Sequence, residues 1–203
     1  FNAADAGAFE ANCAAYGNPY TLGTIQADLV TDLRTAIDCA NQNATDDIID
    51  LNGQTVTFSD SFADYSGATA LPSITSNITL TNGILDSSTP SYRYLFVDGV
   101  GTLSLDTVTL RNAGESSIFG GGVYVNTGST LNVLDSTFAN LTADRAGAIW
   151  SFGNVNIVGS TFSDNSVTFN GGALIGNTDS VTTITNSTFV RNNADNDGGA
   201  IHI

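Results

Sequence analysis

From about residue 76 onward the chain repeats itself with a period of roughly 25 residues. Three apolar columns keep constant offsets through the successive copies. The reference column consists of Leu80, Leu105, Val133, Ile157 and Ile184. Its members are 25, 28, 24 and 27 positions apart, so the variation in length must fall in turns. A repeat of this length is typical of one solenoid coil made of three short strands and three turns.

The residues between these columns favour strands over helices. Thr, Ser, Val, Asn and Gly prevail there, and all of them suit strands and turns better than helix interiors. Stacked parallel coils bond backbone to backbone at about 4.8 Å per coil, which places equivalent residues above one another. We therefore predict an all-β fold, a right-handed parallel β-helix of about six coils.

Two further columns are assigned to the inside and the outside of this solenoid. An apolar column five residues after the reference column is the predicted core ladder, and it consists of Leu85, Leu110, Phe138, Phe162 and Phe189. A threonine column one residue earlier is interpreted as turn or solvent-facing, and it consists of Thr109, Thr137, Thr161 and Thr188. Small residues follow each ladder residue by 9 to 12 positions. Among them we predict coil-corner glycines, where positive φ and close backbone approach are needed, at Gly122, Gly147, Gly172 and Gly199.

The first part of the chain has a different pattern. Leu33, Ala36, Ile37 and Ala40 have the spacing of a short amphipathic helix, and Asp32 is the candidate for its N-cap. We expect residues 1–45 to form an N-terminal cap over the apolar end of the solenoid, and residues 46–203 to form the coils. The C-terminal end, by contrast, is expected to be uncapped. Further coils of a longer chain, or a second subunit added head to tail, would then cover it.

The charge of the chain excludes some partners. Its net charge is −15, it has no Lys, and its five Arg stand singly along the sequence. Binding to nucleic acid or to an anionic membrane surface needs clustered basic residues, so neither is expected. No apolar run approaches the roughly 20 residues of a membrane-spanning helix, and insertion into a membrane is not expected either.

Cys13 and Cys39 are the only cysteines, and they stand 26 positions apart. Two cysteines exclude a four-Cys zinc site and leave a disulfide or two buried thiols. We favour the disulfide and a secreted or cell-surface location. Asn-x-Ser/Thr sequons, which support export only slightly because they are expected by chance in such a chain, begin at Asn43, Asn77, Asn140 and Asn186.

Several of these motifs resemble those of known secreted proteins. Gly198 to Ile201 reads Gly-Gly-Ala-Ile, and Phe162 with Asn165 and Phe189 with Asn192 read Phe-x-x-Asn. These are similar to the repeats of polymorphic outer-membrane proteins, found in autotransporter passengers. The segments Leu33 to Ile37 and Leu71 to Leu80 resemble a wider group of secreted bacterial right-handed β-helix proteins. The resemblance implies a parallel β-helix at the cell surface and says almost nothing about chemistry.

An enzyme is the main alternative, because several β-helix families cleave acidic polysaccharides. Asn177, Thr178 and Asp179 match the first motif of polygalacturonase-like hydrolases, but the second carboxylate that a glycosidase needs is not indicated elsewhere. Arg191 could approach Asp164 or Asp195 on an adjacent coil, as polar turn residues of a solenoid do routinely. We interpret the first motif as a turn and expect no catalytic residues.

Metal and histidine chemistry have little support in the sequence. His202 is the only histidine, which excludes a triad or a histidine metal cluster within the chain. Asn193, Asp195 and Asp197 resemble the first half of an oxygen-ligand calcium loop, and an ordinary Asn/Asp turn is the favoured alternative. No other cofactor is expected.

The prediction for function is an extracellular structural or adhesive solenoid, either a passenger segment or a filament subunit. Its partners would be other coils of its own kind, and possible further partners are a glycan or the surface of a host or neighbouring cell. The alternative is a polysaccharide-binding or polysaccharide-degrading β-helix module.

Overall fold

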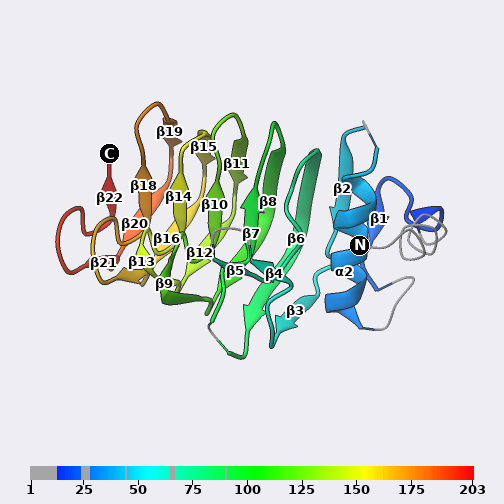
Figure 1. The fold of residues 1–203 in the computed structure, drawn as a ribbon, viewed down its shortest axis with the longest axis horizontal. Coiled ribbons are helices and arrows are strands. Elements are labelled where there is room, and N and C mark those ends of the chain that lie inside the picture. The colour runs from blue at the N-terminus through cyan, green and yellow to red at the C-terminus, as the bar shows by residue number, and fades with distance from the viewer. Residues whose placement is uncertain (1–12, 24–27, 44, 65–66, 90) are drawn as a thin grey trace.

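The computed structural model describes residues 13–23, 28–43, 45–64, 67–89 and 91–203. Within them the chain is mostly strand, wound into a parallel β-solenoid of about six turns with one helix near the N-terminus. Figure 1 shows the strands stacked side by side from the helical end to the C-terminus. The predicted fold class is confirmed.

Three parallel sheets run along the solenoid. The large sheet bends around one side and contains β1 (Tyr20–Thr21), β2 (Asp47–Asp50), β3 (Thr55–Phe58), β6 (Asn77–Ser87), β8 (Thr102–Arg111), β11 (Thr130–Leu134), β12 (Thr137–Ala139), β15 (Asn154–Val158), β16 (Thr161–Ser163), β19 (Val181–Thr185) and β20 (Thr188–Val190). The second sheet contains β7 (Leu95–Val97), β10 (Val123–Val125), β14 (Ile149–Ser151), β18 (Leu174–Gly176) and β22 (Ile201–His202). The third sheet contains β9 (Gly114–Phe119), β13 (Thr142–Arg145), β17 (Ser166–Val167) and β21 (Asn193–Ala194). A short antiparallel pair is formed by β4 (Ala63–Asp64) and β5 (Ala68–Thr69), and Thr69 of β5 also forms a parallel bridge to Arg93.

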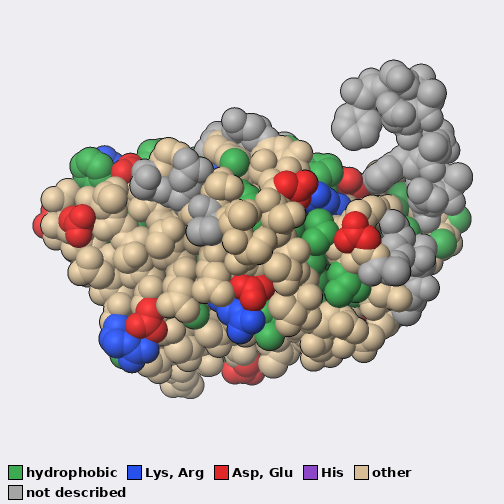
Figure 2. Space-filling view, turned by 90° about the horizontal axis from the view of Figure 1, so that it is seen from below, with side chains coloured by type: hydrophobic (Ala, Val, Ile, Leu, Met, Phe, Trp, Pro, Cys, Tyr) green, Lys and Arg blue, Asp and Glu red, His purple; other side chains and the backbone are tan. Residues whose placement is uncertain are grey.

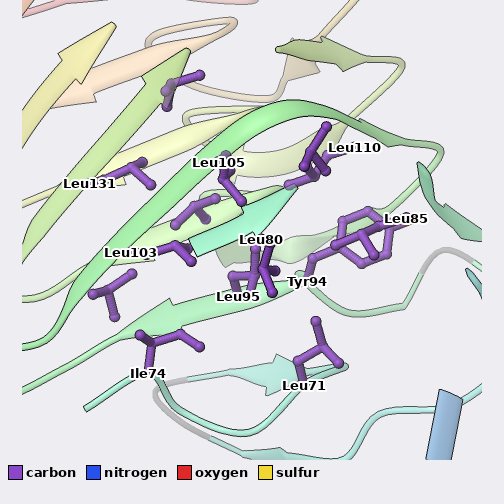
Figure 3. Packing of buried hydrophobic residues seen from close by; sticks show 14 of the residues in the cluster. Leu71, Ile74, Leu80, Leu85, Tyr94, Leu95, Leu103, Leu105, Leu110 and Leu131 are labelled. Carbon is purple, nitrogen blue, oxygen red and sulfur yellow. The ribbon is translucent and has the colours of Figure 1, made fainter. Parts of the chain in front are cut away.

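The register of the coils is the one that the apolar columns predict. Val133 in β11 lies opposite Leu105 in β8 on one side and Ile157 in β15 on the other. Side chains alternate along these strands, so the apolar columns point inward and form one continuous core. Figure 3 shows Leu80, Leu105 and neighbouring leucines of successive strands converging in that core.

The predicted ladder lies in this core. Its first four members, from Leu85 to Phe162, are fully buried, and Phe189 in the last coil is half-buried. The ring of Phe162 stacks between those of Phe138 and Phe189, with centroid distances of 4.7 and 4.6 Å. The threonine column occupies strand positions that are half-buried or exposed, outside the core.

The coil corners are turned mainly by residues other than the predicted glycines. Two series of corner residues have left-handed backbone conformations, and they consist of Asn82, Thr107, Asp135, Gly159 and Asn186, and of Asn112, Asn140, Asp164 and Arg191. Asn and Asp adopt this conformation more readily than other residues with a side chain. In the third series the positive φ falls at Gly120, Ala146, Gly171 and Gly198, one residue before the glycines predicted at Gly147, Gly172 and Gly199.

Gly147 and Gly172 are needed because a side chain at either position would collide with the backbone of the next coil. A Cβ on Gly147 would lie 2.4 Å from the carbonyl oxygen of Gly172, and one on Gly172 would lie 2.0 Å from that of Gly199. Gly199 itself has room for a Cβ, with the nearest atom at 3.7 Å. Gly122 is out of register with this series, because Val123 lies opposite Ile149 and the equivalent residue is therefore Gly121.

We expect Gly172→Ala to lower the free energy of unfolding by about 2 kcal/mol, because the new methyl group would force two backbones apart. Gly199→Ala is the matched control, since its Cβ meets no close neighbour, and it should change the free energy by less than about 0.5 kcal/mol. Urea unfolding followed by circular dichroism measures both. Equal effects of the two substitutions would show that coil spacing does not depend on this glycine.

The N-terminal helix covers one end of the solenoid. Helix α2 (Leu29–Ala40) packs against β2, β3 and β6, and its buried face includes Leu33, Ala36 and Ile37. β1 pairs with β2, so strands in the register of the solenoid begin within the segment predicted as cap. Cys13 and Cys39 form a disulfide, as predicted, with a Cα–Cα distance of 5.2 Å.

The predicted N-cap at Asp32 is wrong. The helix begins four residues earlier than the pattern suggests, and Asp28 is the N-cap, accepting a hydrogen bond from the backbone N–H of Val30 at 3.2 Å. Asp32 is fully buried in the first turn, where it accepts hydrogen bonds from the hydroxyls of Tyr16 and Tyr20 and from the N–H of Gly23, at 2.9, 2.6 and 2.7 Å. Asp32 therefore joins the segment before the helix to α2.

We expect the cap to make stability depend on pH through Asp38. Burial raises the pKa of this carboxyl to about 6, from 3.8. Because the folded chain holds the proton more tightly than the unfolded one, this contribution to stability is fully present below pH 3.8 and is lost as the pH rises through about 6. Asp38→Asn should therefore be more stable than the native chain at pH 7, by at most about 3 kcal/mol, with the difference vanishing below about pH 4. Urea unfolding across this range measures it, and a difference that does not vary with pH would contradict the assignment.

Candidate functional site

The outer face of the large sheet carries a regular polar array. Ser104, Asn132 and Asn156 are in register on successive coils. The Asn132 side chain donates to Ser104 at 3.2 Å, and Asn156 donates to Asn132 at 3.0 Å, so each coil is bonded to the next on the outside as well as through the backbone. Thr79 and Thr183 continue the array on either side. The result is a ladder of short polar side chains that stiffens one lateral face.

Two arginines, Arg191 and Arg111, pair with acidic residues of neighbouring coils. Arg191 donates to Asp164 from Nε and Nη2 at 2.6 and 2.7 Å, and Arg111 donates to Asp86 at 2.8 Å. Figure 2 shows one face, on which charged side chains are few and basic groups touch acidic ones. The hydrogen bond from Arg191 lowers the pKa of Asp164. A carboxylate held ionised in this way is a weak proton acceptor, which argues against general-base chemistry at this pair.

The motif shared with hydrolases is a turn. Asp179 has a left-handed backbone with φ of 68°, and the N–H of Ser180 donates to the carbonyl of Asn177 at 3.0 Å. The side chain of Asn177 donates to the carbonyl of Ser151 in the preceding coil, also at 3.0 Å. The motif therefore has a complete structural role as a coil corner.

The calcium candidates lie at the last corner of the third sheet. Asn193, Asp195 and Asp197 are exposed, and their backbone N–H groups bond to the preceding coil. Among the described residues, no group of three or more His, Cys, Asp or Glu side chains is close enough to share a metal ion. Calcium at this corner stays a prediction. His202 is half-buried in β22, opposite Ile175.

The third sheet bears a groove that crosses three coils. Its lining is mostly short and polar, and consists of Thr142, Ala143, Ser166, Val167, Thr168, Asn193 and Asp195. Phe169 follows the lining residue Thr168 in the chain; its side chain is 42% exposed, and the guanidinium of Arg145 lies 5.1 Å from its ring centroid. Thr168 donates to Asp144 at 2.9 Å. The groove therefore presents hydroxyl, amide and carboxylate groups together on one face.

One feature of the Phe-x-x-Asn motif was not anticipated from the sequence. Asn165 is fully buried, donates to the carbonyl of Phe138 at 3.1 Å and accepts from the N–H of Leu141 at 3.0 Å. Asn192 makes the equivalent bonds to Phe162 and Asn165, at 2.9 and 3.1 Å. Each motif asparagine thus hydrogen-bonds the backbone of the coil before it, and the motif serves the architecture.

An aromatic cluster on the second sheet was also missed. Phe96, Tyr124 and Trp150 are in register on β7, β10 and β14, and their side chains lie outside the main core. Phe96 and Tyr124 stack with centroids 5.0 Å apart, and Phe119 stacks on Trp150 at 4.7 Å. Phe96 and Trp150 are only 5% and 7% exposed, so this cluster is a second apolar layer instead of an open stacking platform. The sequence shows an aromatic residue at the centre of each of these three-residue strands, but this pattern does not show which side of the strand faces the core.

Comparison of the chain with protein-family models, with curated proteins and with solved structures finds no match in any of the three. Among the residues that the structure describes, none of the helices has the length and apolar character needed to cross a membrane.

Proposed function

We propose that the chain is an extracellular scaffold, a stiff solenoid that presents repetitive lateral faces and carries out no catalysis. The observation that carries the proposal is the polar ladder of Ser104, Asn132 and Asn156, which repeats one kind of surface from coil to coil. A structural or adhesive protein needs such repetition, because many weak contacts along one face add up to firm attachment.

Two further observations support the proposal. The cross-coil pairs Asp86–Arg111 and Asp164–Arg191 use their charges to join neighbouring coils. The cap contains the Cys13–Cys39 disulfide. Disulfides form and persist mainly in oxidising surroundings, which supports a secreted or cell-surface location. Passenger segment and filament subunit are both compatible with this role, and self-association end to end would extend the same faces.

Adhesion through the lateral face is tested with beads coated with the chain and scored for attachment to cells and to immobilised polysaccharides. The double variant Asn132→Glu, Asn156→Glu leaves the core intact but removes the ladder's hydrogen bonds and places two like charges in register, so it should unfold at a lower temperature than the native chain. It should still be folded at the assay temperature, as circular dichroism checks, and should lose most attachment. Asp179→Asn is the matched control at a remote corner and should attach normally. Native beads that attach no better than albumin-coated beads would contradict an adhesive role.

Polysaccharide binding is the second candidate function, and the groove of the third sheet favours it. Its mostly polar lining crosses three coils, and the exposed Phe169 follows the lining residue Thr168 in the chain. Phe169→Ala should weaken retention on a polysaccharide column at least tenfold, whereas Phe62→Ala, at a ring of similar exposure elsewhere, should not. Equal retention of both variants would remove this groove from consideration.

A further inference from the structure

A small cavity lies at the junction of α2, β1 and β2, away from the lateral faces. Its volume is about 20 Å³, enough for one water molecule or one small ion. Tyr16 and Tyr20 line one side, Ala40 at the end of α2 lines another, and Asp47 of β2 completes the wall. This cavity belongs to the cap and has no part in the function proposed above.

The carboxylate of Asp47 is buried at this cavity without full compensation. The residue is 8% exposed, and its Oδ2 atom has no hydrogen-bond partner among the residues that the structure describes. The two tyrosine hydroxyls beside it donate to Asp32 instead. A buried carboxylate oxygen that lacks a donor is unfavourable unless the group takes up a proton or a cation lies beside it.

The surroundings are electrically negative, and no basic side chain of the described residues forms an ion pair with this group. The C-terminal end of α2, which carries partial negative charge, lies at the cavity and has no basic residue in its last turn. The arginine ion pairs of the described residues involve other carboxylates. Burial, followed by the nearby charge of Asp46, raises the pKa of Asp47 against an opposing hydrogen bond from Asn43.

We propose that the cavity binds one small, oxygen-preferring cation through the Asp47 carboxylate, and that this cation stabilises the cap. Ca²⁺ and Na⁺ share the required chemistry, since both are hard ions that take carboxylate, carbonyl and water oxygens. The site differs in position and ligands from the loop of Asn193, Asp195 and Asp197. It joins the sheet edge to the helix, so its occupancy strengthens the attachment of the cap to the first coils.

The test compares melting temperatures of the chelator-treated chain in CaCl₂, in NaCl and in tetramethylammonium chloride at equal ionic strength, because tetramethylammonium is too large for the cavity. The native chain should melt about 5 °C higher at a hundredfold excess of the bound cation over its Kd. A rise with CaCl₂ alone identifies a divalent site, and a rise with both salts shows that Na⁺ suffices. No rise above tetramethylammonium chloride with either salt would overturn the proposal.

Two variants test whether the rise in melting temperature comes from a cation at Asp47. Asp47→Asn has the same size without the charge and should abolish the rise, whereas the double variant Asp195→Asn, Asp197→Asn should keep it. The reverse result would place the cation at the third-sheet corner and overturn the proposal. Amide NMR of the native chain serves if Asp47→Asn does not fold. Shifts on adding CaCl₂ or NaCl should then concentrate at residues 16–20 and 43–49, and shifts confined to residues 193–197 would count against the site.

Discussion

Phe162→Ala should lower the free energy of unfolding by about 3 to 5 kcal/mol, which is among the largest effects expected of a single core substitution. Its ring is fully buried between Phe138 and Phe189, at centroid distances of 4.7 and 4.6 Å. Removing it leaves a cavity that the stacked coils cannot close, because their spacing is set by backbone hydrogen bonds on both sides. Urea unfolding followed by circular dichroism measures the loss.

Thr161→Ala is the control for this substitution, one residue away on the outer face of the same strand. Thr161 is half-buried, outside the core, and its replacement should cost less than about 1 kcal/mol. Similar small effects at both positions would mean that the strand register is wrong by one residue and that Phe162 faces outward.

Loss of the Cys13–Cys39 disulfide should cost about 3 kcal/mol, the second large effect. The bond closes a loop across 26 positions and restricts the unfolded chain, while in the folded chain it ties the segment before β1 to the last turn of α2. Reduction of the native chain, or the double variant Cys13→Ser, Cys39→Ser, should lower the melting temperature by several degrees.

Two comparisons make the disulfide result interpretable. The double serine variant should melt at the same temperature with and without reductant, which separates the bond from other effects of reduction. Peptide mapping of the unreduced native chain should show Cys13 and Cys39 joined. Recovery of both as alkylated free thiols would contradict the pairing and weaken the argument for a secreted location.

The sequence predicted the fold because the repeat carries the same information many times. Each copy of the apolar columns indicates which strand positions face inward. A copy with an irregular pattern can therefore be assigned by alignment with the other copies. The ladder from Leu85 to Phe189 followed from this repetition, whereas the pairing of Cys13 with Cys39 followed from their being the only two cysteines. Helix α2 was found from its apolar spacing, but its start was misplaced, because Asp32 and Asp28 are both plausible caps and only burial distinguishes them.

The parts that could not be predicted depend on contacts between coils. The strands of the second sheet are apolar on both sides, so Phe96, Tyr124 and Trp150 gave no alternation to show which side faces the core. Corner residues such as Asn82 and Asp135 have left-handed conformations that only the stacked structure reveals. The burial of Asp47 depends on how α2 packs on β2, which no local pattern encodes.

The most direct test of the proposed scaffold role is a single incubation of the chain with a panel of neutral and uronate-containing polysaccharides, followed for both retention and chain length. The proposal predicts that polysaccharide length is unchanged relative to buffer, whether or not the chain is retained. Shortened or unsaturated products that increase with protein concentration, and that are lost in Asp164→Asn or Asp179→Asn, would contradict it and identify the chain as an enzyme.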